Sequence, residues 1–347
     1  MKEIILDEAD YRENLFPFTL TREIADIRVG IFTLREKWEH FFHYRVAGTG
    51  TSPKITHTLP ANIIPSKKLV DFLESEHTLH SAIPADLCLN KIDYPWQIFE
   101  LNDREIRNDF LLITMGRKTA QLSTTNRVIS PENVFLEPGA NVEHAMLNAS
   151  TGPIYIGRNA QVMEGAIIRG PFALCEGAQV RMGAVIYGAT TVGPWSVAGG
   201  EIKNSILFSH SNKAHTGYLG DSVIGSWCNL GAGTTNSNLK NNASGVRVWN
   251  PYRNTFLRAG LKCGLLMGDY SKSAINTAFN TGTVVGACVN VFCDGLTPTY
   301  FKSFTWGETA RYEFDKAIQH ISNWKKMSNE SLTEAEIRTL THIFEQP

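Results

Sequence analysis

The chain has 347 residues, of which 43% are hydrophobic and 19% are charged, and its formal net charge is −1. This composition can bury a large core and lacks a basic excess, which excludes wholesale disorder and argues against a nucleic-acid or anionic-membrane partner. The acidic start MKEIILDEADYRE lacks the apolar stretch of a signal peptide, no run approaches the roughly 18 apolar residues of a membrane span, and six scattered cysteines contain no CxxC pair. We therefore expect a soluble, reduced, cytoplasmic protein.

Residues 1–130 predict a small α/β domain. The pattern favours an apolar strand over 4–6, a helix around 31–42 and further apolar segments at 63–73 and 106–114. A phosphate-binding loop would need glycines directly after the first strand, because backbone N–H groups must reach the phosphates.

No glycine precedes Gly30, and the G-T-G-T at 48–51 follows a predicted helix. We therefore expect a reduced domain that serves binding or assembly. The alternative is an unusual phosphate site, built from Asp7, Arg12, Arg22 and Arg28.

A hexapeptide repeat occupies the middle of the chain. Residues 131–296 hold 23 of the 28 glycines, and every sixth residue of one stretch is small or aliphatic: Ile156, Val162, Ile168, Leu174, Val180, Ile186, Val192 and Ala198. A period of six fits neither a helix nor a strand, but it is typical of a β-helix in which three hexads complete a coil. The sequence therefore predicts a mainly β chain built on a left-handed parallel β-helix over 131–296.

Residues 297–347 predict a helical tail, with helices over 309–326 and 333–344. The second helix starts with T-E-A-E, a capping box in which Thr333 is the cap and Glu336 reaches back. We expect this tail to pack against the β-helix or to reach a neighbouring subunit.

The repeat falters between Lys203 and Ile224, and the interruption contains Lys203, Lys213, His215 and Tyr218. A second interruption, at 236–266, predicts a protruding loop, and long loops on a rigid scaffold are often functional. Histidine suits general-base work at neutral pH, so His215 is the candidate base, with an ordinary surface histidine as the alternative.

Zinc is a further alternative, because His210 and His215 have the spacing H-x4-H. A catalytic zinc ion needs three protein ligands and an open position. β-Helical carbonic anhydrases use a similar pair plus a third histidine, and this resemblance implies a third ligand near 174–180, where the chain has Cys175 and no histidine. We therefore predict no metal at this site.

The segments that interrupt the repeat resemble the acetyltransferase half of the bifunctional N-acetylglucosamine-1-phosphate uridyltransferase/glucosamine-1-phosphate acetyltransferase (GlmU) family, most closely its archaeal and Bacteroidetes types. The resemblance covers 136–295 and is carried by E-I-K-N-S (201–205), K-A-H-T-G-Y-L-G-D (213–221), N-L-G-A-G-T (229–234) and S-N-L-K (237–240). Upstream, L-F-P-F-T-L-T-R (15–22) is similar to the P-L-T stretch of sugar-nucleotide pyrophosphorylases.

This resemblance implies acetyl-CoA-dependent N-acetylation of an amino-sugar phosphate such as glucosamine-1-phosphate, in a homotrimer. His215 would take the proton from the 2-ammonium group, and Lys203, helped by Arg181, would bind the sugar phosphate. The resemblance also implies that Tyr218, Asn229 and Asn238 orient the acceptor and that the backbone at Ala232 lies beside the pantetheine arm.

Two other functions stay open at this point. One is a sugar-1-phosphate nucleotidyltransferase that works through the N-terminal domain, with Arg12 and Arg22 binding the nucleotide and Mg²⁺ as its metal. The other is a non-catalytic assembly or sugar-binding module.

Overall fold

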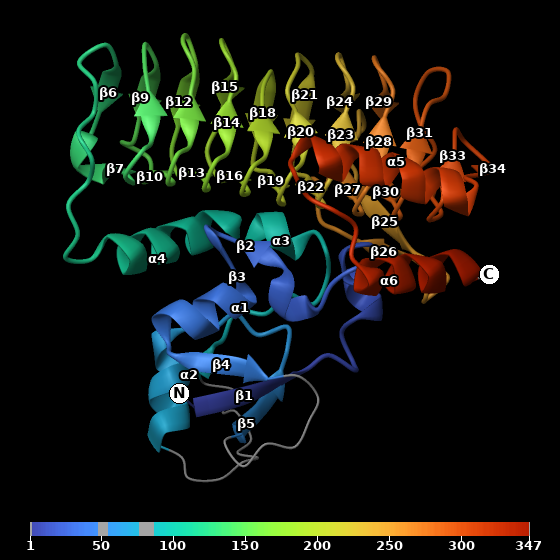
Figure 1. The fold of residues 1–347 in the computed structure, drawn as a ribbon, viewed down its shortest axis with the longest axis horizontal. Helices are drawn as coiled ribbons and strands as arrows, with labels where there is room; N and C mark the ends of the chain where they lie inside the picture. Colours follow the sequence, from blue (N-terminus) through green and yellow to red (C-terminus); the bar gives the residue numbers. More distant parts are fainter. Residues whose placement is uncertain (1, 48–54, 76–86, 347) are drawn as a thin grey trace.

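The computed structural model describes residues 2–47, 55–75 and 87–346, so the G-T-G-T segment at 48–51 lies outside the described residues. Figure 1 shows a long β-helix, a smaller α/β unit on one side of it, and two C-terminal helices against another side. The predicted fold class is confirmed: a mainly β chain with a left-handed parallel β-helix, a small N-terminal α/β region and a helical tail.

The N-terminal unit contains a three-stranded parallel sheet with the strand order β4-β1-β5. Its strands are β1 (Lys2–Asp7), β4 (Tyr44–Ala47) and β5 (Ile55–Pro60), and its longer helices are α2 (Lys67–Ser75), α3 (Gln97–Glu100) and α4 (Asn102–Thr114). The predicted strand over 4–6 lies within β1, and the apolar segment at 106–114 forms most of α4.

The helix predicted around 31–42 is only partly present. This region contains β2 (Arg28–Val29), β3 (Phe32–Thr33), α1 (Leu34–Glu36) and the π-helical segment η4 (Lys37–Phe41). The backbone N–H groups of Ile31 and Phe32 donate to Asp109 Oδ2 of α4, at 2.8 and 3.4 Å. Because a carboxylate far along the chain satisfies these donors, the residues are extended and the helix begins later than predicted.

Three parallel sheets form the walls of the β-helix. The first sheet contains β6 (Arg127–Ile129), β9 (Met146–Asn148), β12 (Ile167–Arg169), β15 (Val185–Ile186), β18 (Glu201–Lys203) and β21 (Tyr218–Gly220), and β24 (Thr235–Asn236) and β29 (Ala278–Phe279) form a separate pair beyond it. The second sheet contains β7 (Val134–Leu136), β10 (Ile154–Ile156), β13 (Phe172–Leu174), β16 (Thr190–Val192), β19 (Ile206–Leu207), β22 (Val223–Ile224), β27 (Leu266–Met267), β30 (Val284–Val285) and β32 (Tyr300–Phe301). The third sheet contains β8 (Asn141–Val142), β11 (Gln161–Val162), β14 (Gln179–Val180), β17 (Val197–Ala198), β20 (Asn212–Lys213), β23 (Asn229–Leu230), β28 (Lys272–Ser273), β31 (Asn290–Val291), β33 (Thr305–Trp306) and β34 (Ala310–Arg311).

The hexapeptide repeat fills the interior of this prism. All eight repeat positions from Ile156 to Ala198 are at most 2% exposed and belong to one apolar core. The coils run from β6 to β33 and therefore extend beyond both ends of the predicted range 131–296. The division of the chain into three domains stays a prediction.

Different partners cover two faces of the prism. The second sheet contacts the N-terminal unit, where the side-chain amide of Asn102 in α4 donates to the carbonyl of Ala189 at 2.7 Å. Helix α5 (Phe314–Met327) lies along the third sheet, where Lys272 sits over the ring of Trp324 at 5.4 Å. The first sheet forms the face that points away from both (Figure 1).

The C-terminal helices follow the predictions closely. Helix α6 (Glu334–Glu345) starts with the predicted capping box between Thr333 and Glu336. Helix α5 begins later than predicted because β34 first pairs antiparallel with β33.

The loop predicted at 236–266 is an ordered hairpin made of β25 (Arg247–Asn250) and β26 (Thr255–Arg258). It packs back onto the N-terminal unit, and the amide of Asn250 donates to the carbonyl of Glu13 at 3.0 Å.

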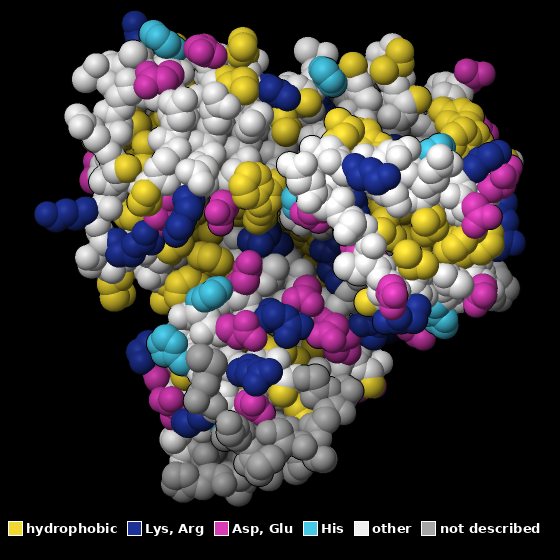
Figure 2. Space-filling view, in the orientation of Figure 1, with side chains coloured by type: hydrophobic (Ala, Val, Ile, Leu, Met, Phe, Trp, Pro, Cys, Tyr) yellow, Lys and Arg dark blue, Asp and Glu magenta, His cyan; other side chains and the backbone are white. Residues whose placement is uncertain are grey.

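The surface fits the near-neutral composition. In Figure 2, side chains of both charge signs are interspersed over the visible face. In the described part of the chain, no helix combines the length and the apolar character needed to cross a bilayer.

Candidate functional site

One edge of the prism, between the third and first sheets, carries three of the predicted site residues. His215 is exposed in the turn between β20 and β21, Arg181 is exposed in the turn between β14 and β15, and Ala232 lies between β23 and β24. Neighbouring coils of a β-helix are about 4.8 Å apart, so residues two or three coils away are within reach of one ligand. We call this the 215 edge. Among the described residues, no group bonds to the imidazole of His215.

The outer face of the first sheet adds two more predicted residues beside this edge. Lys203 in β18 pairs with Gly220 in β21, and Glu201 pairs with Tyr218. Ile202 and Leu219 are buried, so their strand neighbours point outward. Lys203 is exposed and forms no ion pair within the described residues, which leaves its ammonium group free for an anion.

Asn238 and Tyr218 belong to a polar network around Asp221. The amide nitrogen of Asn238 donates to Tyr218 Oη at 3.1 Å and also to Asp221 Oδ2, while the amide of Asn204 donates to Asp221 Oδ1 at 2.6 Å. Asp221 is only 5% exposed, so this carboxylate holds both amides in place.

The same network affects the pKa of the Tyr218 hydroxyl. Burial, reinforced by the charge of Asp221, raises the pKa of Tyr218, which keeps its hydroxyl protonated at neutral pH. The ring also lies over Gly220, where an added Cβ would be 2.2 Å from the tyrosine oxygen. Asp221 was not among the predicted site residues, although it is the acidic residue of the motif K-A-H-T-G-Y-L-G-D.

Lys213 points into the prism and not toward a ligand. It occupies an inward repeat position, is 1% exposed, and its ammonium group donates to the carbonyls of Gly199, His215 and Thr216 at 3.2, 2.6 and 3.4 Å. Burial lowers the pKa of Lys213 to about 8. The interruption of the repeat at this point thus fixes the turn that carries His215.

Asn229 lies on a different face from Lys203 and Tyr218. It is in β23 of the third sheet, between Asn212 and Lys272 of the neighbouring strands. Because the turn toward the 215 edge begins just after β23, Asn229 flanks the edge from its other side.

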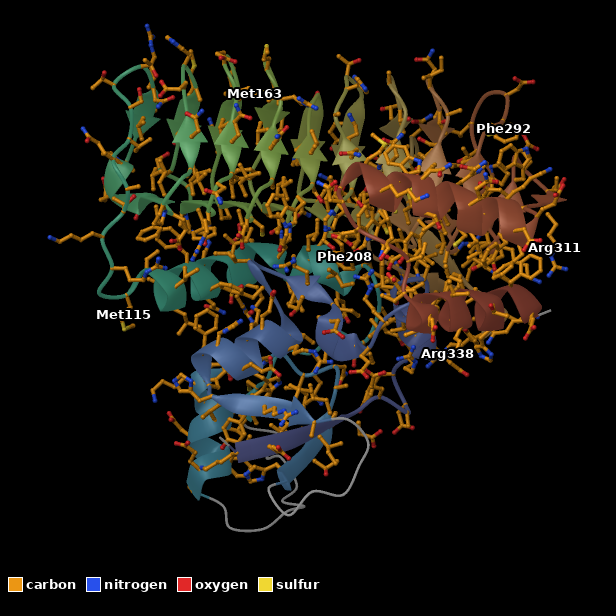
Figure 3. The ribbon with its side chains drawn as sticks, viewed as in Figure 1. Met115, Met163, Phe208, Phe292, Arg311 and Arg338 are labelled. Atoms are coloured by element: carbon orange, nitrogen blue, oxygen red, sulfur yellow. The ribbon has the colours of Figure 1, made fainter. Side chains whose placement is uncertain are left out.

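The arginines proposed for a nucleotide are paired with other groups of the protein. Arg12 pairs with Glu8 and donates to the carbonyl of Thr19. Arg22 pairs with Asp269 of the β-helix, and its guanidinium lies 4.5 Å from the ring centre of Phe208, which Figure 3 labels where the β-helix faces the N-terminal unit.

The other two members of that alternative site are also separated. Arg28 is buried, donates to the carbonyl of Ile31 and pairs with Glu36 at 3.2 Å. Asp7 accepts from the backbone of Ala9 at 3.1 Å at the end of β1. The described contacts therefore do not gather these four charged groups around one phosphate.

The H-x4-H pair and Cys175 are likewise apart. His210 pairs with Glu330 at 3.2 Å and stacks on Trp227, whereas the thiol of Cys175 contacts the carbonyl of Ile31 at 3.6 Å. Within residues 2–47, 55–75 and 87–346, no group of three or more His, Cys, Asp or Glu side chains could hold a metal ion.

Comparison with known proteins finds similarity to sugar nucleotidyltransferases and to bifunctional GlmU proteins. A family model described as "Sugar nucleotidyl transferase" matches residues 4–77. The chain is 36% identical over 87 residues to "Bifunctional protein GlmU" of Methanococcus maripaludis strain C5, which covers 25% of this chain and 21% of that protein. It is 29% identical over 236 residues to the Methanococcus vannielii protein of the same name, covering 65% and 50%.

A third relative is the "Bifunctional sugar-1-phosphate nucleotidylyltransferase/acetyltransferase" of Sulfurisphaera tokodaii, 32% identical over 92 residues, covering 26% of this chain and 23% of that protein. The matched regions thus span about a fifth to a half of the length of these relatives. A solved UDP-N-acetylglucosamine acyltransferase from Arabidopsis aligns over 64% of this chain and 88% of its own, with 12% identity and a TM-score of 0.27, a likeness too slight to argue from. The predicted resemblance to GlmU-type transferases is confirmed.

Proposed function

We propose that this GlmU-like chain transfers the acetyl group of acetyl-CoA to the amine of an amino-sugar phosphate of the glucosamine-1-phosphate type, with His215 as the general base. The observation that carries the proposal is the 215 edge itself. An exposed histidine without a bonding partner lies there, with exposed Arg181 two coils earlier on the same edge and the unpaired Lys203 on the outer face of the adjoining first sheet.

The chemistry needs a free amine and a nearby thioester. His215 accepts a proton from the 2-ammonium group, the amine attacks the acetyl carbonyl, the C–S bond breaks, and the CoA sulfur leaves and takes up a proton. Holding both substrates together contributes up to about 7–11 kcal/mol in favourable systems, and a positioned base adds about 10²–10⁴-fold.

The remaining residues bind and orient. Lys203 and Arg181 supply positive charge for the phosphate, and Tyr218 and Asn238 hydrogen-bond sugar hydroxyls from their positions around Asp221. Asn229 approaches from the third sheet, and the backbone at Ala232 lies beside the pantetheine arm. Both substrates belong to the cytoplasm, which is where we expect the protein.

The site lies open on a prism edge, so we also propose that the chain works as a homotrimer in which a second copy supplies the facing wall. The outer face of the first sheet carries exposed apolar side chains that such a contact would bury, among them Met146 and Ile167, each 47% exposed, and Tyr187, 43% exposed.

The test is CoA-thiol release from acetyl-CoA with glucosamine-1-phosphate. We expect His215→Ala to lower kcat at least a hundredfold, because the base is lost. His144→Ala is the matched control, since His144 is an exposed histidine on the same prism edge, between β8 and β9, and should leave the rate unchanged.

No release by the wild type with this sugar or other amino-sugar phosphates would overturn the transferase assignment and favour a non-catalytic module. Equal rates in wild type and His215→Ala would overturn the role of the base.

Nucleotidyl transfer by the N-terminal unit is the second candidate, favoured by the family model that matches residues 4–77. Within the described residues, no group of three or more His, Cys, Asp or Glu side chains could hold the Mg²⁺ ion that this reaction would use. The test is pyrophosphate release from UTP and N-acetylglucosamine-1-phosphate with and without Mg²⁺, and no release under either condition would exclude this candidate.

A further inference from the structure

A second edge of the prism, between the second and third sheets, stacks one left-handed residue per coil. The backbone φ is positive, between 54° and 63°, at Asn159, Gly177, Trp195, His210, Trp227, Tyr270, Cys288 and Phe304. The turn imposes this conformation in every coil, although it is unfavourable for bulky side chains by about 1–2 kcal/mol per residue. A bulky side chain at this edge therefore indicates a contact that offsets the cost of the backbone conformation.

Most of these side chains are covered by the C-terminal helices. Trp227, Tyr270 and Phe304 are at most 9% exposed and belong to one apolar cluster with residues of α5 and α6. Among the aromatic residues of this series, Trp195 alone is exposed, at 53%. Trp195 lies one coil before His210, and the C-terminal segment covers this edge only from His210 onward.

The rings of Trp195 and His210 lean away from each other. A Cβ at Gly177, one coil before Trp195, would be only 2.2 Å from the indole, so the indole lies flat over that glycine. His210 instead stacks on Trp227 of the following coil, with ring centres 4.1 Å apart and planes within 4°. Both rings line one open space on this face of the prism, which we call the slot.

This slot is part of a cavity of about 520 Å³. Its outward-facing floor consists of Gln179 and Val197, which pair across β14 and β17. Its rim is made by Ser328 and Glu330 from the connection between α5 and α6, and Glu330 pairs with His210 Nε2 at 3.2 Å.

The chemistry of the lining selects the ligand. The indole offers an apolar face, while Gln179, Ser328 and Glu330 offer hydrogen-bonding groups around it, a mixture typical of small-molecule sites. No lysine or arginine lines the cavity within the described residues. Lys325, 3.8 Å from Glu330, is shared between Glu330 and Glu336, so the lining offers no free cation to a phosphate.

An uncharged or cationic ring with one apolar C–H face and a hydroxyl-bearing edge fits this lining, whereas a nucleotide or a sugar phosphate does not. We propose that this slot binds a pyranose sugar without phosphate, stacked on Trp195 and hydrogen-bonded to Gln179 and Glu330. Trp195 and His215 lie at opposite edges of the third sheet, and the proposal is independent of the acetyltransferase assignment.

The test is a titration of the full chain with N-acetylglucosamine and its β-1,4-linked dimer, followed by tryptophan fluorescence and ligand-observed NMR. Trp195→Asn removes the ring and keeps a residue that tolerates the left-handed backbone. We expect saturable binding by the wild type, at least tenfold weaker binding by Trp195→Asn, and at least threefold weaker binding by Glu330→Gln. Trp306→Ala, which removes a tryptophan that is 40% exposed on β33, is the matched control and should bind as the wild type does.

His215→Ala should also bind the sugar normally, so the sugar-binding result can be interpreted even if the acetyltransferase proposal fails. The absence of saturable binding by the wild type, or undiminished binding by Trp195→Asn, would overturn the proposal. Binding of uridine or adenosine in place of the sugars would overturn the ligand class. Dissociation of an oligomer by Trp195→Asn, without sugar binding by the wild type, would assign the slot to a second copy.

Discussion

Single residues inside the β-helix depart from the repeat where the fold needs a polar group. Lys213 takes an inward position, and its ammonium group donates to three carbonyls in the turns of the 215 edge. Two of these carbonyls belong to the turn that carries His215. The carboxylate of Asp221 accepts hydrogen bonds from the side-chain amides of Asn204 and Asn238 near Tyr218. Buried polar groups are stable only with such partners, so each departure marks a place where the backbone geometry is held by a side chain.

Lys213 also predicts a pH dependence of stability. Burial lowers its pKa from the ordinary 10.5 to about 8. Between these values the unfolded chain binds more protons at this site than the folded chain, so the contribution of Lys213 to stability increases as the pH rises. We expect the unfolding free energy of the wild type, relative to Lys213→Met, to rise by at least about 1 kcal/mol between pH 7.5 and pH 10.

Urea unfolding of both proteins at several pH values measures this difference. Lys203→Met is the control, because it removes an exposed lysine instead of a buried one. A flat difference for Lys213→Met would show that the buried ammonium group does not titrate in this range.

At the level of elements, a buried ion cluster joins η4 to α4. Lys37 pairs with Glu105 at 2.6 Å and with Asp109 at 2.7 Å, and all three side chains are at most 3% exposed. Asp109 also accepts from the backbone of Ile31. The cluster therefore fixes the start of the helical region as well as its packing.

Removal of the cation should leave two carboxylates buried without their partner. We expect Lys37→Met to lower the free energy of unfolding by about 3–5 kcal/mol. Lys67→Met is the matched control, since Lys67 is 82% exposed in its pair with Asp71, and it should change the free energy of unfolding far less. Equal losses in the two variants would contradict the structural role of the cluster.

At the scale of the whole molecule, the N-terminal unit and the β-helix are one packed body. Phe18 packs against Phe208 with ring centres 5.5 Å apart, and Thr21 donates to Asp269 at 2.7 Å beside Arg22. The segment similar to the P-L-T stretch of pyrophosphorylases thus serves a contact between the two halves.

The proposed trimer gives a prediction at this scale. Sedimentation should give about three times the chain mass of 38.6 kDa, and Ile167→Glu should shift the protein toward monomer, because a charge would be buried in the proposed contact. Met327→Glu, at the 79% exposed end of α5, should leave the mass unchanged. A monomeric wild type would contradict the trimer.

Local patterns were sufficient for much of this protein. The six-residue period predicted the β-helix because every repeat position has to point into the same narrow interior, and the capping box at Thr333 predicted the start of α6 because its partners are three residues apart. The motif K-A-H-T-G-Y-L-G-D located the candidate site because its residues are close in sequence and occupy a single coil. The roles proposed for its residues remain predictions.

The rest depended on contacts between distant residues. Arg22 was proposed for a nucleotide, but it pairs with Asp269, and the segment at 31–33 is extended because Asp109 binds its backbone. The inward orientation of Lys213 and the slot beside Trp195 also arise only when neighbouring coils are stacked. The sequence by itself determined the repeat, the tail and the position of the candidate edge, while the tertiary structure decided which charged groups face solvent, because burial and pairing depend on residues that no local pattern brings together.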